Sequence, residues 1–256
     1  MTDESDRVPA ARLRFNPQEA FPPEDPMSLP LLRLMAATND ALLHQKHAII
    51  NRERAETAGD LDKAILNGDL GYHVRMLCGH LFEAGRAFRS LYDAVSDLLK
   101  GDAEAEQALA LLQEIYGDTS EASFYATVLG RIRNLAAFHY KEEQFKDGVV
   151  AFGDAPADIV ISPHRGIGRY VITDQILSRS VWEFAGGTQD KFSEMVSKAI
   201  TLADALGVVV SHLLIHLFDS RHVKFEQQHG KLMIEAEIWR MKKKVDDERQ
   251  KQSRDS

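Results

Sequence analysis

The sequence has a single cysteine, Cys78, so it can form neither an internal disulfide nor a metal site built from several thiolates. Cys78 lies in an apolar helical run, which is typical of a buried structural thiol. No apolar run reaches the roughly 20 residues that a membrane span needs. The most apolar stretch, ALGVVVSHLLIHLF, is shorter and carries two histidines. The opening MTDESDR is acidic and polar, unlike a signal peptide. We therefore expect a cytoplasmic protein with no membrane segment.

A strong excess of positive charge is also missing. The 256 residues include 31 lysines and arginines against 39 acidic residues, a formal net charge of −8. This balance excludes a protein coated in positive potential, although it leaves room for a local basic site. With 44% hydrophobic and 27% charged residues, the composition is that of a soluble globular protein. The length allows a sizeable core, and no internal repeat divides the chain.

Helical periodicity dominates the chain after a different N-terminal segment. Residues 1–27 are rich in proline and charge and predict a disordered arm. Apolar residues then recur at steps of three and four, which predicts helices. The stretch NGDLG predicts a break before the second of them. We expect helices over residues 28–55, 69–100, 102–116, 119–145, 188–217 and 221–250, with a disordered tail at 251–256.

One region has a different texture. DIVIS and RYVIT contain β-branched pairs and flank PHRGIG, which predicts a short β-hairpin at about residues 157–174. Long helices with short connections favour antiparallel packing. The predicted fold is therefore predominantly α, an antiparallel helical bundle with a short inserted β-hairpin, forming a single domain over residues 28–250.

The stretch RIRNLAAFHY, residues 131–140, combines basic and apolar residues in one of the predicted helices. Arg133 can hold a phosphate with a bidentate fork and stabilise charge that builds on it. His139 titrates near neutrality, so it can take or donate a proton. Asn134 can donate a hydrogen bond to a phosphate or orient the imidazole. These groups suit phosphodiester cleavage in RNA, where the 2′-hydroxyl is the nucleophile and no metal or other cofactor is needed.

Helix geometry limits how these residues can cooperate. Six steps along a straight α-helix separate Arg133 and His139 by about 120° and about 9 Å. The two side chains converge on one small group only if the helix breaks between them or if a second copy supplies its own pair. A two-fold axis beside the helix presents the same residues twice. The spacing therefore favours a homodimer.

The stretch from Arg133 to His139 resembles the R-X4–6-H motif of the HEPN superfamily, with a polar residue, Asn134, directly after the arginine as is typical there. The resemblance implies a helical, often dimeric protein. Many members are metal-independent ribonucleases of toxin–antitoxin and defence systems. It implies that Arg133, Asn134 and His139 are catalytic, that RNA is cleaved to a cyclic phosphate, and that a protein antitoxin or regulator is a partner.

Two other interpretations remain open. A HEPN-like protein can be a non-catalytic dimerisation or partner-binding module. The same segment can also be an ordinary amphipathic helix, with basic residues that complement the dipole at its C-terminus.

Further polar residues are candidates for substrate contacts. His164, Arg165 and Arg169 surround two glycines in PHRGIGRY, a loop that can receive a phosphate, although a tight hairpin turn is the simpler interpretation. Arg131 is a further candidate for a substrate contact, because it lies two residues before Arg133. We expect these four residues to contact RNA if the protein is a ribonuclease.

Two histidine pairs complete the set. His212 and His216 stand four residues apart, the spacing of a two-histidine metal pair, with a third ligand from Asp219 or another helix. No glutamate follows the first histidine as it does in H-E-x-x-H sites, so core or interface histidines are the preferred interpretation and no metal is expected. His73 and His80 lie near one helix face. Either could support His139 if their helix packs beside the motif.

Overall fold

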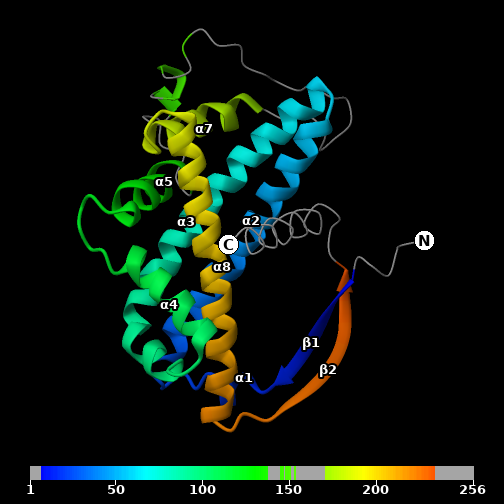
Figure 1. Ribbon diagram of the computed structural model, residues 1–256, viewed down its shortest axis with the longest axis vertical. Coiled ribbons are helices and arrows are strands. Elements are labelled where there is room, and N and C mark those ends of the chain that lie inside the picture. Colours follow the sequence, from blue (N-terminus) through cyan, green and yellow to red (C-terminus); the bar gives the residue numbers. More distant parts are fainter. Residues whose placement is uncertain (1–6, 138–144, 147, 151–152, 154–170, 234–256) are drawn as a thin grey trace, which may run out of the picture.

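The computed structural model describes residues 7–137, 145–146, 148–150, 153 and 171–233. Within them the protein is predominantly α-helical, with one two-stranded antiparallel sheet (Figure 1), which confirms the predicted fold class. The helical elements in chain order are α1 (Pro17–Ala20), α2 (Ser28–Thr57), α3 (Asp60–Leu98), α4 (Ala103–Tyr116), η2 (Tyr125–Leu129), α5 (Gly130–Ile132), η3 (Arg133–Ala137), α7 (Val171–Phe184) and α8 (Gln189–Ser220).

Three long helices, α2, α3 and α8, form the centre of the bundle (Figure 1). The chain reverses at Ala58 and Gly59, so α2 and α3 run antiparallel. Gln45 of α2 donates to Asp204 of α8 at 2.8 Å and joins these two helices. Apolar side chains at helical spacing fill the space between the helices, as burial of apolar surface requires. Fully or almost fully buried members include Leu31, Leu34, Leu77, Leu81, Phe88, Leu206, Val209 and Leu213.

The predicted break at NGDLG is wrong, because α3 runs through it without interruption. The physical reason is a close helix contact at Gly71. A Cβ placed there would lie 2.0 Å from the hydroxyl oxygen of Ser178 on α7. The glycine therefore lets α7 approach α3 closely. In the sequence alone, a glycine that serves such a helix contact looks the same as a glycine that ends a helix.

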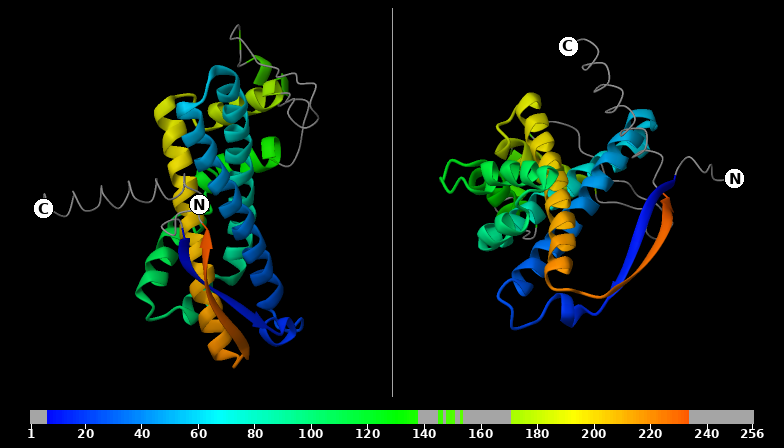
Figure 2. Two further views of the ribbon diagram at one scale, coloured as in Figure 1. Left: turned by 90° about the vertical axis from the view of Figure 1, so that its right-hand side faces the viewer. Right: turned by 60° about the horizontal axis from the view of Figure 1, so that its bottom comes forward.

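The two strands join segments from opposite ends of the described chain. β1 (Arg7–Phe15) pairs antiparallel with β2 (Phe225–Met233), from Arg7 opposite Met233 to Phe15 opposite Phe225. The two-stranded sheet joins the helical bundle at one end, where β1 leads into α1 and α8 leads into β2 (Figure 2). Phe15 packs edge-on against Phe218 of α8, with 4.7 Å between ring centroids.

The expected disordered arm over residues 1–27 is therefore wrong for residues 7–27. They contain β1 and α1, and Ala20 and Phe21 are buried in the core. Arg221 at the end of α8 bonds the carbonyl of Ala20 and the carboxylate of Asp25, which fixes the segment. Residues 1–6 lie outside the described residues.

The hairpin expected at about residues 157–174 lies mainly outside the described residues. From Val171 onward the segment is helix α7, so the strand expected over RYVIT is wrong at its end. A helix was also expected over residues 221–250, but residues 225–233 form β2, whose partner strand is more than 200 residues away. The rest of that range and the tail at 251–256 lie outside the described residues.

Helix α8 is, among the described helices, the one long and apolar enough to cross a membrane by length and composition, with a mean hydropathy of 1.8 in its most apolar window. A core helix of a soluble protein passes the same test. Several of its apolar side chains, such as Leu202, Leu206 and Leu213, lie in the core between α2, α3 and α4. The cytoplasmic location stays a prediction.

Candidate functional site

The stretch RIRNLAAFHY begins at Arg131 in α5 and continues into η3, a short segment that packs on α3. Ile132 and Ala137 are buried and fix the orientation of the segment. Arg133 is part-exposed and Asn134 is exposed. His139, the third residue of the predicted catalytic set, lies outside the described residues, so its position relative to Arg133 stays a prediction.

Arg133 is held by two acceptors. Its Nε donates to Oε1 of Glu83 on α3 at 2.7 Å, and its Nη1 donates to Oδ1 of Asn134 at 2.9 Å. Within the described residues, Nη2 makes no hydrogen bond or ion pair. The Arg133 side chain is 27% exposed. One edge of the guanidinium is therefore fixed, while the head remains accessible to an anion.

Two π-helical turns, η2 and η3, flank α5 in this region. A π-turn closes hydrogen bonds over five residues, and such turns often mark functional sites. The first part of the motif therefore departs from the straight α-helix used to place Arg133 against His139. The α-helical rotation per residue that gave a separation of about 120° between Arg133 and His139 therefore does not apply over residues 133–137.

Aromatic contacts attach the segment before the motif to α3. Tyr125 of η2 stacks on Phe82, with ring centroids 4.6 Å apart, and donates its hydroxyl to the Phe82 carbonyl at 3.1 Å. The guanidinium of Arg89 lies 3.9 Å from the Tyr125 ring centroid, a cation–π contact. Burial raises the pKa of Tyr125, so this hydroxyl is a neutral structural donor. These contacts provide a rigid base for Arg133.

Of the predicted substrate contacts, Arg131 is described and exposed. Its guanidinium lies 5.8 Å from the ring centroid of Phe184 on α7, whereas Arg133 reaches α3. The structure thus directs these two arginines to different helices. His164, Arg165 and Arg169 lie outside the described residues.

Four histidines meet where α2 faces α3. His44 Nδ1 lies 2.9 Å from His73 Nδ1, which is hydrogen-bonding distance. The His44 ring stacks on His80 at 5.4 Å between centroids, and His47 stacks on His73 at 4.9 Å. His80 Nδ1 lies 3.5 Å from Asp40 Oδ2. We call His44, His47, His73 and His80 the histidine cluster.

The surroundings of two members of the cluster, His44 and His80, favour neutral imidazoles. Burial lowers the pKa of His44, and the charges of His80 and His47 lower it further against the opposing effect of Asp40. Burial also lowers the pKa of His80, against the opposing charges of Asp40 and Glu83. The charge of Glu83 opposes this lowering of the pKa of His80, and the same carboxylate accepts a hydrogen bond from Arg133. The histidine cluster and the motif therefore share one carboxylate on α3.

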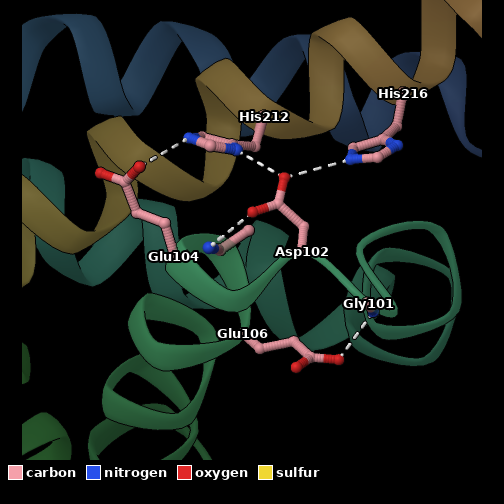
Figure 3. A network of polar contacts seen from close by, with 7 residues as sticks. Gly101, Asp102, Glu104, Glu106, His212 and His216 are labelled. Atoms are coloured by element: carbon pink, nitrogen blue, oxygen red, sulfur yellow. Dashed lines mark hydrogen bonds and ion pairs between the residues drawn. The ribbon is translucent and has the colours of Figure 1, made fainter.

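The second histidine pair, His212 and His216 of α8, contacts the carboxylate of Asp102 at the N-terminus of α4 (Figure 3). His212 Nδ1 lies 2.6 Å from Asp102 Oδ2, and His216 Nε2 lies 3.2 Å from the same oxygen. The other ring nitrogen of His212 lies 3.6 Å from Oε2 of Glu104. Asp102 also caps α4 by accepting from the Ala105 amide at 3.2 Å. The third partner of the pair is thus Asp102.

This arrangement is a clasp between α4 and α8. Hydrogen bonds from His212 and His216, and then from the Ala105 amide, lower the pKa of Asp102 to about 2. The carboxylate therefore stays ionised near neutral pH and holds both imidazoles. Over the described part of the chain, no group of three or more His, Cys, Asp or Glu side chains could hold a metal ion.

Several residues of these sites escape sequence reasoning. Glu83, His44 and His47 contact residues that are remote in sequence, and no local pattern marks them. Asp102 carries a local signal, because it stands at the start of the helix predicted over residues 102–116 and aspartate is a good N-cap residue. That signal predicts the cap, but not the two histidines more than 100 residues later.

Comparisons of the chain with family models, with curated proteins and with solved structures found no match.

Proposed function

We propose that the protein is a HEPN-like, metal-independent endoribonuclease that acts as a homodimer. In this proposal Arg133 binds and polarises the scissile phosphate, Asn134 orients it, and His139 is the acid–base group. A protein antitoxin or regulator and a cytoplasmic location belong to the same proposal.

The observation that carries the proposal is that Arg133 is held in place by two acceptors while its guanidinium stays accessible. A long, flexible arginine side chain normally loses considerable rotamer freedom when it binds an anion. Glu83 and Asn134 already hold two of its nitrogens, and Nη2 lies on a part-exposed head with no partner among the described residues. This pre-organisation lowers the entropic cost of binding a phosphate.

The proposed chemistry needs only groups of the chain and of RNA. The 2′-hydroxyl oxygen attacks the adjacent phosphorus while a base removes its proton. The bond from phosphorus to the 5′-oxygen breaks, and that oxygen takes up a proton. The products are a 2′,3′-cyclic phosphate and a 5′-hydroxyl. His139 of the two copies serves as base and acid, and Arg133 stabilises the charge on the phosphoryl oxygens.

A specific observation favours a second candidate, a non-catalytic dimerisation or partner-binding module. Glu83 compensates the charge of Arg133 at 2.7 Å. An arginine whose charge is already paired can serve to attach η3 to α3. Under this alternative the Arg133–Glu83 pair is a structural link and the protein leaves RNA intact.

Cleavage of RNA by the purified full-length protein in excess EDTA separates the two candidates. Arg133→Ala and His139→Ala are compared with wild type, and Arg52→Ala on the exposed face of α2 is the matched control. The ribonuclease proposal predicts that wild type and Arg52→Ala cut, whereas the two motif variants fold and dimerise but lose at least about 100-fold in rate. Inert wild type supports the module, whereas equal cutting by all four proteins would show that Arg133 and His139 are not catalytic.

A further inference from the structure

A groove between α2 and α3 lies next to the Arg133–Glu83 pair. Its volume is about 420 Å³, within the range of sites for small ligands. Glu83 lines the groove and accepts the hydrogen bond from Arg133. The other lining residues used below are Pro30, Arg33 and Ala36 of α2 and Arg86 and Ala87 of α3.

Positive charge exceeds negative charge around this groove. Arg86 lies 3.5 Å from Glu83 Oε2, a longer contact than the 2.7 Å bond between Arg133 and Oε1 of the same carboxylate. Arg33 is exposed and forms no ion pair with the residues that the structure describes. The groove and the Arg133–Glu83 pair beside it together contain three guanidinium groups and one carboxylate, in a protein whose net charge is −8.

The apolar part of the groove adds a second type of contact. Pro30, Ala36 and Ala87 add small, rigid hydrocarbon groups to the same lining as the two arginines. A phosphate held by Arg33 or Arg86 thus has apolar surface beside it, which suits the sugar and the face of a base. Bidentate arginine contacts to phosphate are the common way in which proteins bind the nucleic-acid backbone.

We infer that this groove binds a nucleotide of a single-stranded RNA next to the scissile phosphate, with Arg33 and Arg86 on its phosphate groups. The inference rests on the proposed ribonuclease function and names how the substrate is held. Arginine binds the backbone, and Pro30, Ala36 and Ala87 offer apolar contact to any base, so the groove accepts many sequences. Ser90, which also lines the groove, donates its hydroxyl to the Ala87 carbonyl at 2.7 Å.

The contribution of each arginine has a measurable signature. Each phosphate contact releases counterions, so log Kd changes with log salt concentration by about 0.7 per contact for single strands. Loss of Arg33 or Arg86 should therefore weaken binding and flatten the salt dependence together. A side chain that matters only for folding would not change the slope.

The experiment measures binding of a fluorescent 2′-O-methyl RNA of about 12 nucleotides, which has no free 2′-hydroxyl to react, to the full-length protein at several salt concentrations. Arg33→Ala and Arg86→Ala are compared with Arg52→Ala, an exposed arginine on α2 about 28 Å from Arg33 along the helix. We expect each groove variant to raise Kd about 5–10-fold at low salt and to lower the slope by about 0.7, and the control to change Kd less than about twofold.

Because Arg33 is exposed and unpaired among the described residues, its variant tests the groove even if Arg86→Ala, which loses its contact with Glu83, proves unstable. If wild type cuts RNA but both groove variants bind like Arg52→Ala, or wild type fails to bind the probe, the inference is wrong and the ribonuclease proposal stands. If wild type neither binds nor cuts RNA, the proposed function fails and the inference fails with it.

Discussion

Glu83 of α3 accepts a hydrogen bond at 2.7 Å from Nε of Arg133, a residue 50 positions later in the chain. The same carboxylate lies 3.5 Å from Arg86, lines the groove between α2 and α3, and acts on the pKa of His80. Glu83 therefore links the motif, the groove and the histidine cluster.

Replacing this carboxylate by its amide should separate binding from turnover. In Glu83→Gln, Arg133 loses its charged partner, so the guanidinium is more available to phosphate and KM for RNA should fall. The arginine is also less well oriented, and kcat should fall about 10-fold, the equivalent of a charged hydrogen bond of about 1.5 kcal/mol. Steady-state cleavage measures both constants. Glu114→Gln, an exposed glutamate on α4, is the control. A raised KM with unchanged kcat would contradict this role.

The histidine cluster should make the protein sensitive to mild acid. The pKa values of His44 and His80 are lowered in the folded state, so the unfolded chain binds protons more readily. Stability is then fully present above the unfolded pKa of about 6.5 and is lost as the pH falls through the lowered folded values.

Urea unfolding at pH 7.5 and pH 5 measures this effect. The midpoint should be lower at pH 5, and the difference should shrink in a His44→Gln His80→Gln variant. His229→Gln, an exposed histidine of β2, should keep the full difference. A double variant as acid-sensitive as wild type would show that other groups cause the loss.

The clasp between α4 and α8 predicts a graded response at Asp102. Asp102→Asn keeps an acceptor that caps the Ala105 amide, but it loses the negative charge of the carboxylate that contacts His212 and His216. Asp102→Ala loses the cap as well as the charge. The alanine variant should melt about 2–4 °C below wild type, and the asparagine variant should lie between them.

The stabilisation from Asp102 has a defined pH range. The folded pKa is lowered to about 2, so the contribution is present above the ordinary pKa of about 3.8 and is lost as the pH falls through about 2. Thermal melting of the three proteins at pH 7 and pH 2.5 tests this, because their differences should narrow in acid. Differences that are the same at both pH values would contradict the charged clasp.

The close contact at Gly71 predicts a destabilising alanine. A Cβ there would lie 2.0 Å from Ser178 Oγ, so Gly71→Ala should lower the free energy of unfolding by about 1–3 kcal/mol despite the better helix propensity of alanine. Gly207→Ala in α8 is the control, because its Cβ would lie 3.5 Å from the nearest atom, an ordinary contact.

Removing the hydroxyl should rescue part of this loss. Ser178 Oγ is buried and has no hydrogen-bond partner among the described residues, so Ser178→Ala alone should cost little. Gly71→Ala in that background should be less damaging than in wild type, which a double-mutant cycle from urea unfolding measures. Strict additivity would show that the two side chains do not conflict.

Local signals in the sequence account for much of the helical framework. Pro30 lies in the first turn of α2, and Asp102 and Thr188 cap α4 and α8, so these helices begin close to their predicted positions. The prediction failed at NGDLG because Gly71 serves a contact with α7, which no local pattern reveals.

Long-range pairing explains the other failures. The composition of residues 1–27 predicts a disordered arm and not β1, because the partner strand of β1 lies at the other end of the described chain. Side-chain chemistry predicts catalytic roles for Arg133 and Asn134. No local pattern predicts the contact of Arg133 with Glu83, because a hydrogen bond between α3 and η3 depends on how the helices pack. The predicted contact between His139 and His73 or His80 stays a prediction.

The most direct test of the proposed function is the requirement for the 2′-hydroxyl of the substrate. A single-stranded RNA and its all-deoxy counterpart of the same sequence are incubated with wild-type protein in EDTA, and the product ends are identified by mass spectrometry. The account predicts that only the RNA is cut, leaving 2′,3′-cyclic phosphate and 5′-hydroxyl ends. Intact RNA, or equal cutting of both strands, would contradict it.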